Sequence, residues 1–137
     1  MVAVHRTFLA EPGRKADAEP VKAMLGIALG AAVRLTEGGG PLLVGEGIES
    51  TLSAAAAIRE YAPRAWAACS ANGIKKMVLP ESPGQLIVAH DAEAVGTNAA
   101  EDLAARADCA GWQVRLMPPP AGFNDWNDAA CIKGASV

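Results

Sequence analysis

Short apolar runs separated by mixed segments dominate the chain from Pro41 onward. Residues 42–44 form an apolar run that ends in Gly-Glu-Gly, and residues 86–89 form a second such run. Short runs that are apolar throughout are typical of strands buried on both faces of a sheet. We therefore expect buried strands at 42–44 and 86–89, and further strands at 65–69 and 112–117.

The segment after the first of these strands, residues 49–61, is predicted to be a helix. Pro63 should stop it, because proline cannot continue a helix. Its apolar positions roughly fit one helical face. These positions are Leu52, Ala55, Ala56 and Ile58.

Further helical segments are predicted between and after the other strands. Residues 72–79 suit a short helix or turn, and residues 98–110 suit a longer helix that Gly111 closes. Asn124 or Asp125 can cap a last short helix that runs through Ile132. Strands that alternate with helices indicate an α/β fold with a largely parallel sheet.

The run Gly38-Gly39-Gly40-Pro41 separates an N-terminal portion from this main body. We expect residues 1–37 to form a small flap on a single domain that spans residues 1–137. The flap should contain, in order, a strand at 2–9, a turn at Glu11-Pro12-Gly13, a short helix within 20–29 and a strand at 31–35.

Composition supports one compact domain. The chain has 137 residues, of which 51% are hydrophobic. No apolar run approaches the roughly 20 residues of a membrane span, and the first nine residues lack a signal-peptide pattern, so we expect a cytoplasmic location. Cys69, Cys109 and Cys131 are odd in number and widely spaced, so we expect small buried thiols and no disulfide framework or zinc ribbon.

The net charge of −3 on its own argues against a nucleic-acid binder. Six acids, however, gather in three short clusters, and the rest of the chain carries a formal charge of +3. Contact with phosphates therefore stays possible if metal ions neutralise the clusters. The six are Glu46, Glu49, Asp91, Glu93, Asp125 and Asp128.

The first two clusters follow predicted strands, where ligands of parallel sheets bind. Glu46 stands between Gly45 and Gly47, which we expect to allow a tight turn and close approach of a substrate. Asp91 and Glu93 can point at one cation, and Mg²⁺ prefers such oxygen ligands.

Each cluster also has a purely structural interpretation. Glu49 and Asp125 suit the first turn of a helix, where a carboxylate favours the helix dipole or caps the helix. Asp125 and Asp128 lie one helical turn apart and share a face. His90, beside Asp91, could be a ligand or a base, although a lone histidine at a strand end is more often structural.

These residues resemble the Toprim family, the catalytic module of bacterial-type primases, topoisomerases and some nucleases. The family pattern is an apolar strand with a glutamate-glycine turn, then a strand that ends in D-x-D with a nearby glycine. Residues 42–47 match the first part, and residues 86–93 with Gly96 match the second. The resemblance implies a Rossmann-like, mostly parallel sheet flanked by helices, with residues 41–137 as the Toprim core.

The chain is most similar to the Toprim domains of phage- and plasmid-type DNA primases and primase-helicases. The similarity covers almost the whole chain. It is carried by residues 5–9, 22–26, 32–35, 46–53 and the D-x-N-D motif at 125–128.

The resemblance implies a metal-dependent enzyme that transfers phosphoryl or nucleotidyl groups, with Mg²⁺ or Mn²⁺ as cofactor. Glu46 would be the general acid/base or a metal-linked acid, and Asp91, also catalytic, would hold the metal with Glu93. Asp125 and Asp128, and with them Glu49, would support metal or substrate. The chain departs from the pattern at Glu93, one methylene longer than aspartate, and at His90, where small or apolar residues are usual.

Single-stranded DNA and nucleotides would be the partners. Arg6, Lys22 and Arg34 are the candidate phosphate contacts, each equally well explained as a solvated surface charge. The sequence has neither a P-loop motif nor a cysteine-histidine zinc module, so we expect helicase or zinc-binding primase modules to be supplied by partners. Two alternatives stay open, which are a nuclease that uses the same site and a non-catalytic binding domain.

Overall fold

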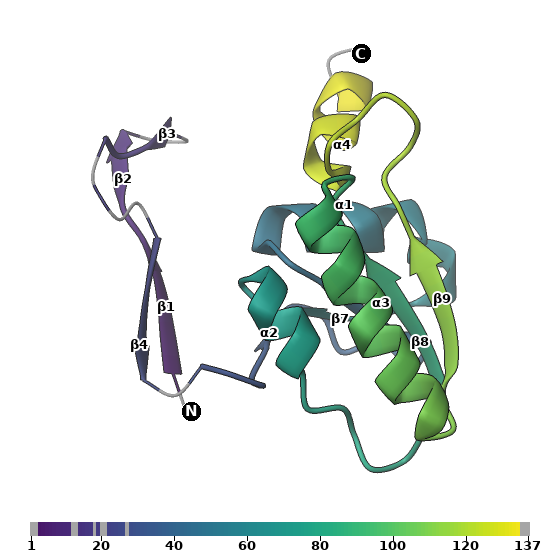
Figure 1. Ribbon diagram of the computed structural model, residues 1–137. Coiled ribbons are helices and arrows are strands. Elements are labelled where there is room, and N and C mark those ends of the chain that lie inside the picture. Colours follow the sequence, from purple (N-terminus) through teal and green to yellow (C-terminus); the bar gives the residue numbers. More distant parts are fainter. Residues whose placement is uncertain (1–2, 12–13, 18, 20–21, 27, 135–137) are drawn as a thin grey trace.

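The computed structural model of the protein describes residues 3–11, 14–17, 19, 22–26 and 28–134. Figure 1 shows a main body, in which helices pack on a sheet, and N-terminal strands that lie to one side of it. Five strands form the main sheet within the described residues. Across the sheet they are β5 (Val33–Arg34), β7 (Arg64–Ala67), β6 (Leu42–Gly45), β8 (Gln85–Ala89) and β9 (Gln113–Met117).

The main sheet is mostly parallel, as predicted. Strand β6 pairs in parallel with β7 on one side and with β8 on the other, and β8 pairs in parallel with β9. Only β5, at one edge, runs antiparallel to its neighbour β7. Because β6 is the first of the four parallel strands along the chain and β7 and β8 lie on opposite sides of it, the connections must cover both faces of the sheet.

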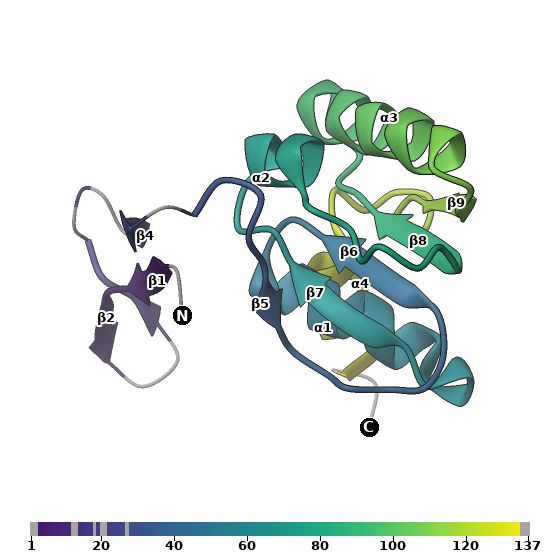
Figure 2. The same ribbon diagram turned by 90° about the horizontal axis from the view of Figure 1, so that it is seen from below.

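The helices form one layer on each face of the sheet, as Figure 2 shows. Helix α1 (Ile48–Ala57) packs with α4 (Trp126–Gly134) on one face, and α2 (Ala71–Lys76) packs with α3 (Ala94–Cys109) on the other. A short 3₁₀ helix, Arg59–Tyr61, follows α1. None of the helices in the described part of the chain has the length and apolar character to cross a membrane.

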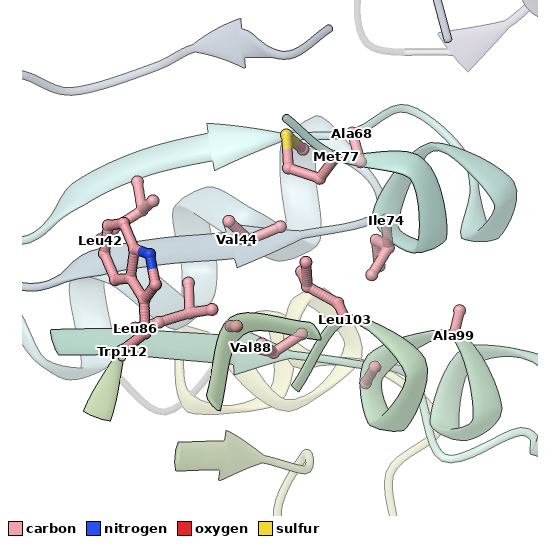
Figure 3. Close-up of a cluster of buried hydrophobic side chains, with 12 residues drawn as sticks. Leu42, Val44, Ala68, Ile74, Met77, Leu86, Val88, Ala99, Leu103 and Trp112 are labelled. Atoms are coloured by element: carbon pink, nitrogen blue, oxygen red, sulfur yellow. The ribbon is translucent and has the colours of Figure 1, made fainter. Parts of the chain in front are cut away.

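The core lies in two layers because successive strand residues point to opposite faces. Leu42, Val44, Leu86 and Val88 point toward α2 and α3, where Ile74, Met77 and Leu103 cover them (Figure 3). On the other face Leu43 packs with Ala54, Ala55, Ala65 and Ala89. Complete burial of a leucine or valine contributes about 1.5–3 kcal/mol, so β6, with three such residues, anchors both layers.

The sequence correctly predicted how α3 ends. Gly111 has φ +87°, the left-handed conformation that glycine adopts without strain. The Trp112 N–H donates to Ala107 O at 3.0 Å, and the Gly111 N–H donates to Asp108 O at 2.9 Å. These two bonds are those of a Schellman motif, which satisfies the last carbonyls of a helix.

The prediction of a helix within residues 20–29 is wrong. Lys22–Gly26 forms β4, an antiparallel partner of β1 (Ala3–Thr7) over five residue pairs. Pairing with a distant strand outweighs a weak local preference for helix. Two shorter strands, β2 (Leu9–Glu11) and β3 (Arg14–Lys15), also pair antiparallel. Pro12 and Gly13 of the expected turn lie outside the described residues.

Two smaller expectations also need correction. Helix α1 buries Thr51, Ala54 and Ala55, whereas Leu52 is 44% exposed. The helix turns its small side chains inward because they let it lie close to the sheet. The cysteines are not all buried thiols, since Cys109 and Cys131 are exposed and Cys69 is half-buried.

Gly45 is needed for packing and not for a turn. Among the described glycines, positive φ occurs at Gly26, Gly30, Gly111 and Gly122, so neither Gly45 nor Gly47 uses the left-handed region. A Cβ at position 45 would collide with Thr51 Oγ1 and lie 3.2 Å from Thr51 Cβ. Thr51 is fully buried and cannot move aside.

We therefore predict that Gly45→Ala lowers the free energy of unfolding by about 1–3 kcal/mol, the usual cost of overpacking a core. Urea unfolding followed by circular dichroism measures this change. Gly39→Ala is the matched control, because a Cβ there meets nothing within 4 Å. Equal stability of the two variants would contradict the packing role of Gly45.

Candidate functional site

The carboxyl ends of β6 and β8 lie next to each other at one edge of the sheet. Val44 is the parallel register partner of Val88, so the chain leaves both strands on the same side. Glu46 is the first residue after β6, and Asp91 is the second residue after β8. Strand pairing alone thus brings the first and second acidic clusters to one end of the sheet.

The end of β7 borders the same place. Beyond the strand itself, the Ala68 N–H donates to Gly45 O and the Cys69 N–H donates to Glu46 O, both at 2.8 Å. Cys69 has φ +64°, an uncommon conformation for a residue with a side chain. These bonds fix the backbone of Glu46. Sequence reasoning missed this contribution, because Cys69 gave no signal beyond its position after an apolar run.

One backbone bond and one indole bond attach the third acidic cluster near the ends of β8 and β9. The Ala92 N–H donates to Asn124 O at 2.8 Å, and Trp126 Nε1 donates to Met117 O at 3.1 Å. The Asp125 carboxylate accepts the Asp128 N–H at 2.8 Å and so caps the start of α4. The segment before α4 is therefore attached directly to the residues that follow Asp91.

The charges of the third cluster act on Asp91 of the second cluster. Burial raises the pKa of Asp91 above the ordinary 3.8, and repulsion from Asp125, Glu93 and Asp128 raises it further. The neighbouring His90 acts in the opposite direction. A carboxylate that is partly desolvated and faces like charges is destabilised in its ionised form, and a bound cation would relieve this.

The glycines near the acids differ in what surrounds them. A Cβ at Gly96, in the first turn of α3, would lie 3.3 Å from both Asp91 N and Asp91 O. This glycine therefore lets α3 start directly against the backbone of Asp91. Gly47 has open space around it, with only Glu49 Oε2 at 3.9 Å from a built Cβ. The surface beside Gly47 is therefore accessible to a ligand.

A complete cage of protein ligands is not present. Among the described residues, no three His, Cys, Asp or Glu side chains are grouped closely enough to hold a metal ion by themselves. Mg²⁺ is typically held by one or two carboxylates, and waters and substrate phosphates supply the rest of its shell. The carboxylates around Asp91 fit that mode of binding.

The candidate basic residues lie away from the acids in the sequence, and the structure describes two of their side chains. Both are exposed and lie over an aromatic ring: the Arg6 guanidinium is 4.9 Å from the ring centre of Phe8, and the Arg34 guanidinium is 4.9 Å from that of Trp66. The side chain of Lys22 is outside the described part of the structure.

The raised pKa of Asp91 has a consequence for stability. The folded protein holds a proton on this carboxyl more tightly than the unfolded chain, whose value is 3.8. The ionised form therefore destabilises the fold above the folded-state pKa, and this cost disappears as the pH falls toward 3.8. We predict that Asp91→Asn raises the melting temperature of metal-free protein at about pH 7. The gain over the parent should shrink as the pH falls toward 3.8.

Thermal melts across the acid range measure the effect, with Glu101→Gln as the control. Glu101 is an exposed carboxylate on α3, and its removal neutralises one charge outside the acidic group. An Asp91→Asn variant that melts at or below the temperature of the parent at neutral pH would show that the acids do not repel one another in this way.

Comparison with known protein families agrees with this geometry. The Toprim domain family matches residues 41–136, which include β6, β7, β8, β9 and all three acidic clusters. No curated protein sequence matches the chain. Toprim domains are generally metal-dependent modules that act on nucleic acid in primases, nucleases and topoisomerases, and they typically bind Mg²⁺. Because the match covers most of the sequence, the chain belongs to the Toprim domain family.

Proposed function

We propose that this domain is a Mg²⁺-dependent nucleotidyl-transfer module of the primase type, which synthesises a primer on single-stranded DNA. The observation that supports this most strongly is the placement of Glu46 and Asp91 at the ends of two paired, buried strands. Both acids closely follow rigid strands, and rigid elements hold the residues of a site more precisely than long loops do. The third cluster adds further negative charge beside Asp91.

The proposed roles follow from position and chemistry. Asp91 and Glu93 would hold Mg²⁺ (or Mn²⁺), with Asp125 and Asp128 as further acids around the ion. When bound, the ion would neutralise charge on the phosphate oxygens of the substrate. Glu46, which is half-buried after β6, would move the proton of the attacking hydroxyl, and the open space beside Gly47 would admit the substrate.

Glu49 would have a supporting role. It lies in the first turn of α1, where its carboxylate also favours the helix dipole. Its charge would add to the potential that attracts a cation to this end of the sheet. It therefore belongs to the acidic surroundings of the site and not to the proposed metal ligands.

The primase assignment rests on the resemblance along the whole chain. Residues 46–53 and 125–128 carry the motifs typical of primase Toprim domains, and residues 5–9 and 22–26 extend the similarity into the N-terminal strands. We propose that residues 1–37 act as a flap on the same domain. A helicase or a zinc-binding primase module would supply unwinding and template binding.

A non-catalytic binding domain is the second candidate. It is favoured by the absence of a three-residue metal group among the described residues and by Glu93 at a position where aspartate is usual. In that case the domain would bind nucleic acid or a partner without transferring a nucleotide.

We predict that Glu46→Gln reduces primer synthesis by about 10²–10⁴-fold, the usual contribution of a general acid or base. The assay uses single-stranded DNA, nucleotides and Mg²⁺ or Mn²⁺, together with the partner modules. Glu101→Gln, on the exposed face of α3, is the charge-matched control. A Glu46→Gln variant as active as the parent would exclude the proposed role, and DNA cleavage without nucleotides would favour a nuclease.

The basic residues give a separate prediction about binding. If Arg34 contacts one phosphate, Arg34→Ala should weaken binding of single-stranded DNA and reduce the slope of log affinity against log salt by about 0.7. Arg115→Ala is the matched control, because Arg115 is an exposed arginine on β9, at the opposite edge of the sheet from β5. Fluorescence anisotropy at several salt concentrations measures both. Equal effects of the two variants would show that Arg34 has no specific contact.

A further inference from the structure

His90 is a buried histidine at the end of β8, directly before Asp91. Its side chain is only 7% exposed. Its Nδ1 lies 2.9 Å from Asp91 O and 3.5 Å from Thr97 Oγ1, in α3. Its backbone N–H points to Met117 O of β9 at 3.4 Å. The imidazole is thus buried, and it lies near Thr97 of α3 and contacts the main chain of the proposed metal-binding acid.

The contact at 2.9 Å defines the protonation of one ring nitrogen. A carbonyl oxygen can only accept a hydrogen bond, so Nδ1 must carry the hydrogen for this contact to be a bond. The position of that hydrogen follows from the neighbouring group and is a testable property of the protein.

The peptide group that follows Asp91 is held from both ends. Its oxygen, Asp91 O, accepts from His90 Nδ1, and its nitrogen, Ala92 N, donates to Asn124 O at 2.8 Å. A Cβ at Gly96 would lie 3.3 Å from Asp91 O, so α3 starts close against the same backbone. A peptide plane fixed at its oxygen and its nitrogen cannot rotate. The main chain that carries the Asp91 side chain is therefore fixed in direction.

The same peptide group connects two acidic clusters. Asn124 directly precedes Asp125, whose charge acts on Asp91. A rotation of the Asp91–Ala92 peptide would break the bond to Asn124, which together with the bond from Trp126 Nε1 to Met117 O attaches the segment at the start of α4. His90 therefore contacts the peptide group through which the second and third clusters are joined.

We propose that His90 is a positioning residue that locks the Asp91–Ala92 peptide group and so holds the second and third acidic clusters together. The lock itself does not depend on a bound ion. Its effect on cation affinity rests on the function proposed above. Neighbours that orient metal ligands typically change metal affinity 10–100-fold when they are mutated.

Two variants separate the hydrogen bond from the bulk of the side chain. In His90→Asn, Nδ2 is bonded to Cγ, as Nδ1 is in histidine, so asparagine can donate to the same carbonyl. His90→Leu introduces an apolar side chain of similar width, which has no hydrogen-bond donor. A role in filling space predicts that leucine is tolerated better, and the proposed lock predicts that asparagine is.

The lock is tested in metal-free protein by nuclear magnetic resonance. Nitrogen shifts should show a hydrogen on His90 Nδ1. Amide hydrogen exchange at Ala92 should be faster by on the order of 10-fold in His90→Leu and near the parent rate in His90→Asn, while Val88 in β8 exchanges as in the parent. An Nδ1 without hydrogen, or equal acceleration at Ala92 and Val88, would overturn the proposal.

The consequence for the site is tested by calorimetric titration with Mn²⁺. We expect about 10-fold weaker binding in His90→Leu and affinity close to the parent in His90→Asn. Equal affinity of His90→Leu and the parent would overturn the functional part of the proposal. If the parent itself binds no Mn²⁺, the proposed metal-dependent function fails, and the exchange rates at Ala92 still decide whether His90 locks the peptide.

Discussion

Leu42, Leu43 and Val44 have no exposed surface, and on both sides their strand is hydrogen-bonded to a parallel neighbour. The main-chain bonds set the register, and the alternating side chains join the helical layers above and below. Everything at the candidate site depends on this pairing, because a shift of one residue would exchange the side chains of β6 that face the two helical layers. The proximity of Glu46 to the end of β8 is thus a consequence of core packing.

The acids at this edge work against the stability of the fold. Asp91 is partly desolvated and faces the charges of Asp125, Glu93 and Asp128, so its ionised form is unfavourable without a cation. Several backbone bonds from neighbouring segments hold this arrangement in place, including those at Glu46 and Ala92. A fold that holds like charges close together is less stable than one without them, and the binding of a cation can recover this lost stability.

The sequence was sufficient to predict the elements whose pattern is set locally or by complete burial. The apolar runs at β6 and β8 and the glycine stop after α3 are of this kind. The antiparallel pairing of Lys22–Gly26 could not be predicted, because it depends on contact with a strand about twenty residues earlier. The prediction of which α1 residues face inward was partly wrong for a similar reason. Small side chains of α1 pack against the sheet, and the sequence alone does not show where that sheet lies.

The residues of the site also differ in whether the sequence alone could identify them. Glu46 and Asp91 could be singled out because each follows a buried strand, and parallel strands end at one edge. The contacts of Asn124 with Ala92 and of Cys69 with Glu46 involve main-chain atoms, and such contacts leave little trace in residue type. His90 was visible only as an unusual residue beside an acid, and its bond to Asp91 O gives it a definite structural role.

The proposed function requires that a divalent cation binds at the shared carboxyl ends of β6 and β8. Paramagnetic broadening of amide signals by substoichiometric Mn²⁺ locates such an ion, because broadening falls steeply with distance from it. We predict broadening centred on Gly47 and Ala92, displaced by excess Mg²⁺. Uniform weak broadening, or broadening centred elsewhere on the protein, would contradict it.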